Sequence, residues 1–110
     1  MGAWPAILKH LGENELTFIS SQSEWDCDAD LHFFSYEPED VLIDTNGQIH
    51  SLTDRQNNFV QPRENGNKIE LEVLNALVKE HASQLGSCCV SKISYPSISD
   101  AIKAVEAIGE

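Results

Sequence analysis

The sequence predicts an α+β fold in which a mostly antiparallel sheet is covered on one face by two C-terminal amphipathic helices. An Asn46-Gly47 pair lies between two apolar runs, a pattern that favours a β-hairpin. Apolar residues then recur with helical spacing over residues 71–85 and 98–108. Because the expected strands precede most of the helix, the α+β class is favoured over a doubly wound sheet.

The N-terminal part of the chain is expected to form a hairpin followed by a short helix. Residues 6–9 and 16–20 are short apolar runs separated by a turn-like polar stretch. Ser21 precedes Glu24 by three residues, which is the spacing of a capping box. This spacing predicts a helix over residues 22–27.

The Asn46-Gly47 pair indicates the turn of a hairpin between strands at 41–44 and 48–52. Both central residues of a type I′ turn need a positive φ, which Asn and Gly tolerate. Further strands are expected at 31–36 and in a second hairpin that pairs 59–61 with 68–70 around a turn at 63–66.

Two helices and an intervening strand are expected in the last third of the chain. Leu71, Leu74, Val78 and Leu85 lie on one stripe of the first helix, and Gly86 is a natural end to it. The second helix begins at Ser97, and a strand is expected over 88–94. The predicted core is Ile7, Leu16, Phe18, Leu42, Ile49, Leu52, Leu71, Leu74, Leu77, Val78, Val90, Ile93, Ile102 and Val105.

The charge of the chain is concentrated in its first half. The 110 residues carry a formal net charge of −11, and no Lys or Arg occurs between His10 and Asp54. The acids of that stretch are Glu13, Glu15, Glu24, Asp26, Asp28, Asp30, Glu37, Glu39, Asp40, Asp44 and Asp54. Such a field repels nucleic acid and anionic membranes and attracts cations or a basic protein surface.

Aromatic residues are interleaved with these acids, which suggests a protein-binding surface. Exposed rings anchor interfaces, and charge complementarity selects the partner. The candidate partner-binding residues are Trp25, Asp26, Asp28, Asp30, Phe33, Phe34 and Tyr36. The alternative interpretation places the rings in the core and leaves the acids to solvate the surface.

Two other kinds of site remain as alternatives. Asp26, Asp28, Asp30 and Glu37 have the spacing of a calcium loop, but Leu31 occupies the position where such a loop needs Gly. A small enzyme with a site near His81 and Cys88 is the second alternative. No hydrolase motif or Gly-rich phosphate loop supports it, and no metal or other cofactor is predicted.

The expected context is a single domain over 1–110 in the cytoplasm. The 41% apolar content supports one core, and no apolar run reaches the length of a membrane span. The N-terminus lacks the features of a signal peptide. Three cysteines, two of them adjacent, do not suggest a disulfide framework.

Three segments together resemble a family of short bacterial proteins of unknown function, found in marine-type gammaproteobacteria. The segments are Trp4-Pro5-Ala6-Ile7, residues 42–49 and residues 81–90. The resemblance covers most of the chain and implies a bacterial cytoplasmic protein without an assigned activity, cofactor or catalytic residue.

The sequence therefore leads to a non-enzymatic binding or accessory module as the expected function. Its acidic, aromatic-containing N-terminal half would contact a basic protein partner. Neither nucleic acid nor a membrane is an expected partner, and the residues do not indicate an oligomeric state.

Overall fold

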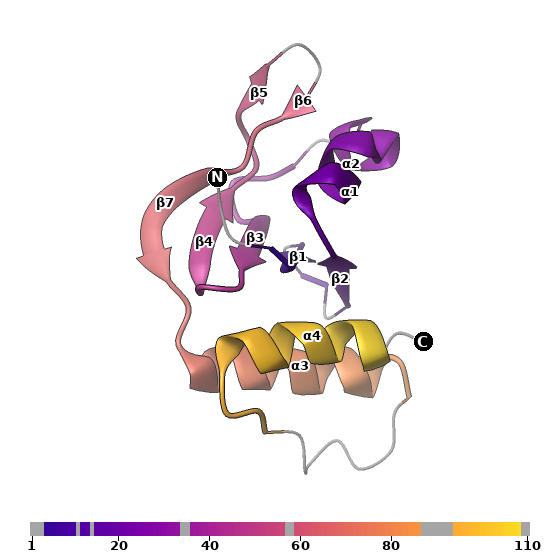
Figure 1. Ribbon diagram of the computed structural model, residues 1–110, viewed down its shortest axis with the longest axis vertical. Helices are drawn as coiled ribbons and strands as arrows, with labels where there is room; N and C mark the ends of the chain where they lie inside the picture. Colours follow the sequence, from indigo (N-terminus) through magenta and orange to yellow (C-terminus); the bar gives the residue numbers. More distant parts are fainter. Residues whose placement is uncertain are drawn as a thin grey trace.

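Five antiparallel strands form the central sheet, in the order β2-β1-β3-β4-β7 (Figure 1). The computed structural model describes residues 4–10, 12, 13, 15–33, 36–56, 59–86 and 94–108. The strands of this sheet are β1 Ala6–Lys9, β2 Leu16–Ile19, β3 Val41–Asp44, β4 Gln48–Ser51 and β7 Arg63–Lys68. The predicted α+β class with a mostly antiparallel sheet is confirmed.

Helices lie on both sides of this sheet (Figure 1). The long helices α3 (Leu71–Gln84) and α4 (Ile98–Ile108) lie together against one face, as the sequence predicted. Three shorter units lie at the opposite end: α1 (Gln22–Cys27), α2 (Ala29–Phe33) and the hairpin of β5 (Arg55–Gln56) with β6 (Phe59–Val60). The sequence did not predict that the second face would be covered.

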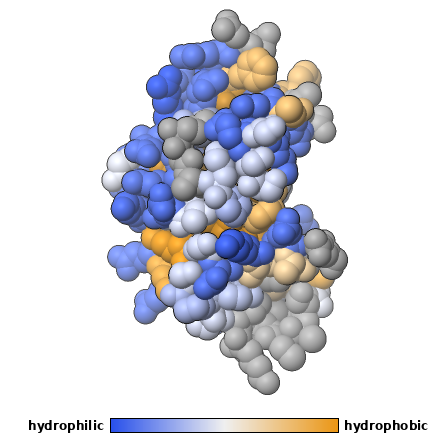
Figure 2. Space-filling model, in the orientation of Figure 1, coloured by the Kyte–Doolittle hydropathy of each residue, from blue (hydrophilic) through white to orange (hydrophobic). Residues whose placement is uncertain are grey.

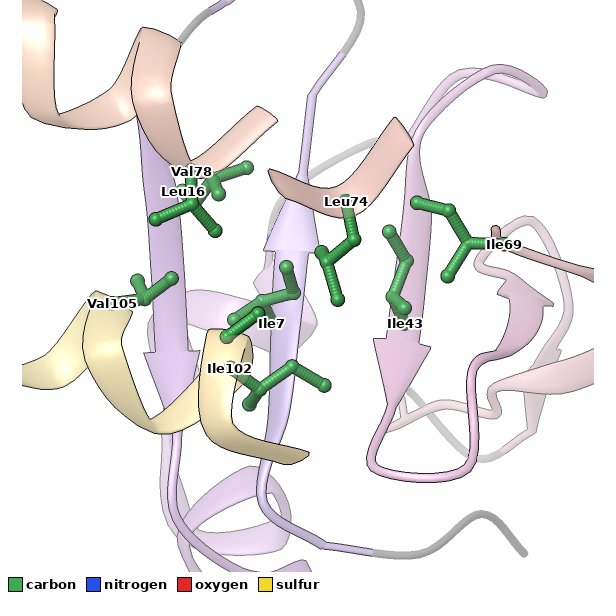
Figure 3. Packing of buried hydrophobic residues seen from close by; sticks show 9 residues of the cluster. Ile7, Leu16, Ile43, Ile69, Leu74, Val78, Ile102 and Val105 are labelled. Carbon is green, nitrogen blue, oxygen red and sulfur yellow. The ribbon is translucent and has the colours of Figure 1, made fainter. Parts of the chain in front are cut away.

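The first core fills the space between the sheet and the two long helices. Figure 3 shows Ile7 and Ile43 pointing from their strands toward Leu74 of α3 and Ile102 of α4. Side chains alternate along a strand, so the neighbours of these strand residues point to the other face. Each strand therefore supplies apolar residues to two cores.

The second core lies on the opposite face of the sheet. Leu8 of β1 and Leu42 of β3 pack there with Trp25 of α1 and Val60 of β6. All four side chains are at most 2% exposed. Strands β1 and β3 are therefore buried on both faces, which explains why they read as continuous apolar runs rather than as alternating ones.

The central hairpin is confirmed, but its turn differs from the predicted type I′ turn. The Gly47 amide donates to the Asp44 carbonyl at 2.9 Å, so Thr45 and Asn46 are the central residues of the turn. Gly47 follows them with a φ of 82°. The Asp44 carboxylate accepts hydrogen bonds from the amides of Asn46 and Gln48, and this carboxylate favours the observed turn.

Local signals predicted the helix boundaries well. Helix α1 spans the predicted residues 22–27, and the Ser21 hydroxyl accepts a hydrogen bond from the Glu24 amide. Helix α4 has the expected Ser97 cap, which accepts from the Asp100 amide at 3.2 Å. These predictions rest on contacts between residues only three positions apart.

Strand pairing between distant segments was predicted less well. The expected hairpin of 59–61 with 68–70 is wrong, because Val60 pairs with Arg55 and β7 pairs with β4. The supposed turn at 63–66 lies within β7, where a register irregularity accommodates Gly66 at a φ of 85°. The expected strand at 31–36 is also wrong, because residues 29–33 form α2.

Most of the predicted core residues are buried. The buried ones are Ile7, Leu16, Leu42, Leu52, Leu74, Val78, Ile102 and Val105. Phe18, Ile49 and Leu77 are partly buried against the first core, and Leu71 is also intermediate. The predicted core residues Val90 and Ile93 lie outside the described residues. The predicted strand at 88–94 does too, except for Ser94.

We predict that Gly47→Ala destabilises the protein more than Gly66→Ala. Both glycines have a positive φ, which costs an L-residue about 1–2 kcal/mol. A Cβ at position 47 would also lie 2.8 Å from Cδ1 of Ile98, whereas nothing lies within 4 Å at position 66. Displacing Ile98 from its rotamer should add about 0.5–1.5 kcal/mol.

Urea unfolding followed by tryptophan fluorescence measures the loss of unfolding free energy in both alanine variants. Repeating the comparison in an Ile98→Val background, which lacks Cδ1, should remove most of the difference between the two alanine variants. Equal losses in the original background would show that Ile98 does not restrict position 47.

Candidate protein-binding surface

The acidic, aromatic segment folds as α1 and α2, which pack over the second core. Trp25 is 1% exposed, so its ring is part of that core and does not face a partner. Its indole N–H donates to the Val60 carbonyl at 3.2 Å. A buried indole needs such an acceptor, and here β6 supplies it.

His32 completes a closed set of hydrogen bonds with Trp25 and Val60. Its Nδ1 accepts from the Val60 amide at 3.0 Å, and its Nε2 lies 2.8 Å from the Trp25 carbonyl. The first bond leaves Nε2 to carry the ring proton, so the imidazole is neutral and donates to Trp25. These three bonds join α1, α2 and β6, which are too short to be stable alone.

Phe33 is an aromatic residue of this segment whose ring faces solvent. It is 90% exposed at the end of α2. Phe59 of β6 is 45% exposed, and its ring meets the edge of His32 at a centroid distance of 5.0 Å. Figure 2 shows hydrophobic atoms among hydrophilic ones at the end of the molecule that carries these elements. Asp26 and Asp28, in and after α1, are exposed as well.

Tyr36 has a mainly structural role, because its contacts join parts of the chain to one another. Its hydroxyl donates to the Leu31 carbonyl at 2.8 Å, and its ring stacks on His10 at 5.7 Å. Burial raises the pKa of Tyr36 to about 12, so the hydroxyl keeps its proton and remains a donor. Phe34 and the side chain of Asp30, the remaining candidates, lie outside the described part of the chain.

Among the acids of this stretch whose side chains are described, Asp40 and Asp44 are internal and do not contribute to an acidic surface. Asp40 is 3% exposed and accepts a hydrogen bond from the Glu37 amide. Asp44 is 2% exposed and pairs with Nε2 of His50 at 2.9 Å. Both carboxylates organise the loops around β3, and the charge count alone could not separate them from surface acids.

The Asp44–His50 pair is a feature that sequence reasoning missed. His50 is 1% exposed, and its Nδ1 has no hydrogen-bond partner among the described residues. One oxygen of Asp44 is committed to the hairpin turn and the other to His50. We therefore assign the pair a structural role; its signal in the sequence was an Asp at the end of a strand before Asn-Gly.

The calcium alternative finds no support in the described residues. The segment forms two short helices rather than a loop, and Asp26 accepts a hydrogen bond from the Gln22 side chain. Where side chains are described, no three His, Cys, Asp or Glu residues come together in a way that could hold a metal ion. Glu37 is exposed, and the side chain of Asp30 lies outside the described residues.

His81 of α3 reaches across to the edge of the sheet. It is 4% exposed, and its Nδ1 accepts from the Leu16 amide at 2.8 Å. Burial lowers the pKa of His81 below its usual 6.5, while Glu15 and the backbone of Val105 act in the opposite direction. Cys88, its proposed neighbour in an enzymatic site, lies outside the described residues.

A pocket of about 430 Å³ adjoins His81 along β2. Its lining combines strand, helix and acidic residues from distant parts of the chain. They are Leu16, Thr17, Phe18, Ser20, Glu24, His81, Val105 and Glu106. The sequence could not place this pocket, because α1, β2, α3 and α4 all contribute to it.

These observations define an α+β domain with an antiparallel sheet that is covered on both faces. The chain belongs to the DUF4144 family, whose model matches residues 4–105 and is described as a protein structure with unknown function. The resemblance to a bacterial family of unknown function is thereby confirmed.

A solved structure supports the same conclusion. The NMR structure of a protein from Shewanella amazonensis is similar, with a TM-score of 0.69 and 30% sequence identity. The similarity covers 97% of this chain and 90% of that chain. No match was found among curated proteins. In the described part of the chain, no helix is long and apolar enough to cross a membrane.

We predict that Trp25→Phe destabilises the protein by about 1–3 kcal/mol. The change removes the indole donor and leaves the buried Val60 carbonyl without its hydrogen bond. Phe33→Ser is the matched control, because this exposed ring should change stability by less than about 0.5 kcal/mol. Chemical denaturation followed by far-UV circular dichroism measures both, and similar losses would contradict the assignment of one ring to the core and the other to solvent.

We also predict that His81 makes stability depend on pH. Its folded pKa is lowered, so the unfolded chain binds this proton more readily. The contribution of neutral His81 to stability is fully present above pH 6.5, the usual pKa, and is lost as the pH falls from 6.5 toward the lower folded pKa. Asn in the variant His81→Asn can still accept the hydrogen bond from the Leu16 amide, but it does not titrate, so this variant should lack the pH-dependent contribution.

The measurement is the difference in unfolding free energy between pH 7.5 and pH 5.5. We expect a larger loss at pH 5.5 for the original chain than for His81→Asn, since all other titrating groups are shared. An equal loss in both proteins would show that His81 is not held in its neutral form.

Proposed function

We propose that this protein is a non-enzymatic binding module whose acidic N-terminal half contacts a basic protein partner. The observation that carries the proposal is the 90% exposure of Phe33 within the base-free stretch of the chain. A phenylalanine gains about 1.5–3 kcal/mol when it is fully buried, so an exposed ring is available as an interface anchor.

The arrangement around Phe33 adds support. The Trp25–Val60–His32 hydrogen bonds fix α2 to β6, and Phe59 lies against His32. The ring is therefore presented from an anchored element, which reduces the entropy that a partner must remove on binding.

Electrostatics favour a basic partner over an acidic one. The net charge of −11 steers cationic surfaces toward the molecule and disfavours nucleic acid. Arg55 donates to the His32 carbonyl at 2.6 Å, so it has a structural contact at the end of α2. We further propose a cytoplasmic location, which the absence of a disulfide-like cysteine pattern supports.

A pull-down from bacterial lysate tests the proposal. The immobilised chain should retain basic proteins at about 50 mM salt and release most of them at about 500 mM, because exposed charges are screened. Phe33→Ser should reduce retention severalfold. Val73→Ser is the control, since Val73 is 52% exposed on α3.

Retention that ignores salt would contradict the electrostatic part of the proposal. Equal retention by Phe33→Ser and the original chain would contradict the role of Phe33.

A further inference from the structure

The two edge strands of the sheet differ in how they are protected. Strand β7 carries Arg63, Lys68 and the Gly66 irregularity, and such charges and bulges discourage pairing with another strand. Strand β2 at the other edge has none of these features in its four residues, Leu-Thr-Phe-Ile. An edge without such features can accept a further strand.

The register of β2 shows which backbone groups point outward. The Leu16 amide donates to His81 rather than to its partner Lys9, so this amide is directed away from β1. Because outward and inward groups alternate along an antiparallel strand, the amide and carbonyl of Phe18 are also directed away from β1. His81 thus covers one outward amide, and the backbone groups of Phe18 lie two residues further along the same edge.

The pocket of about 430 Å³ lies along these same residues. The ring of His81 lines it, and its buried Nε2 lies near the backbone of Val105, which also lines the pocket. Since Nδ1 accepts from Leu16, the neutral ring carries its proton on Nε2. The ring is therefore part of the wall of the pocket, where it holds the Leu16 amide.

The rim of the pocket is acidic. Glu24 comes from α1 and Glu106 from α4, and Glu13 and Glu15, just before β2, line a second pocket of about 380 Å³. No Lys or Arg is among the described residues that line either pocket. Figure 2 shows the molecule narrowing at the level where Figure 1 places β2, between the α1–α2 end and the long helices.

We propose that the β2 edge binds an extended, basic segment of a protein partner by strand addition. The segment would pair its backbone with Phe18 and place its basic side chains near Glu24 and Glu106. A second copy of this chain fits less well, because two such acidic edges would repel each other. The proposal concerns a different surface from Phe33 and does not depend on it.

The probe is a blocked nine-residue peptide of alternating valine and lysine, with a valine–glutamate peptide for comparison. The ¹⁵N-labelled chain is titrated with each at about 50 mM salt, and amide exchange is measured by NMR. We expect the lysine peptide to bind and to slow exchange of the Phe18 amide, while the glutamate peptide does neither.

Paired variants test the contribution of the rim. Glu24→Gln with Glu106→Gln should weaken the lysine peptide about threefold to tenfold. Glu64→Gln with Glu72→Gln makes the same change in net charge at exposed positions on β7 and α3, and should weaken it less than twofold. Phe33→Ser should leave this binding unchanged, which separates the proposal from the one above.

Three results would overturn the proposal. They are no binding at millimolar peptide, binding that protects amides elsewhere than β2, and equal weakening by both pairs of variants. Protection of the Phe18 amide that grows with the concentration of the chain alone would also overturn it, because the edge would then pair with a second copy.

Discussion

The hydrogen bonds that join Trp25, His32 and Val60 are the constraint on which the second core and its covering elements, α1, α2 and β6, depend. Helices α1 and α2 have six and five residues, and β6 has two, so local propensity cannot hold them. Burial of the Trp25 ring against Leu8 and Leu42 supplies the apolar contact, and the three hydrogen bonds satisfy the polar atoms that this burial would otherwise isolate. As a result, His32 points inward and its neighbour Phe33 points outward.

This constraint also connects the two proposed surfaces. Helix α1 follows β2 directly, and Ser20 donates to Glu24 at 2.5 Å where the two meet. The same short helix therefore buries Trp25, supports α2 beneath Phe33 and brings Glu24 to the pocket along β2. The surfaces are separate, but both depend on the packing of α1.

The fold was predictable where its signals are local. The Ser21 and Ser97 caps, the Gly86 helix end and the central hairpin all follow from residues within a few positions of each other. Pairing of β7 with β4 was not predictable, because a Gly-containing polar stretch suits a turn and a strand irregularity equally well. The type I′ turn was wrongly expected because a buried side-chain carboxylate, Asp44, determines which residues occupy the turn.

The candidate sites were less predictable than the fold. Exposure of Phe33 and burial of Trp25 depend on the position of β6, which lies far along the chain. The pocket along β2 combines Glu24 with Glu106 and His81, and no spacing in the sequence indicates that these three residues meet. Charge counting identified the acidic half but could not show that Asp40 and Asp44 are internal.

Hydrogen exchange at the Trp25 indole and the Val60 amide tests the central constraint most directly. If the hydrogen bonds with His32 hold the short elements to the sheet, both protons should exchange as slowly as the amides of β1 and β3. Fast exchange at both positions, with β1 and β3 still protected, would show that α1, α2 and β6 open independently. The account of an anchored binding surface would then be contradicted.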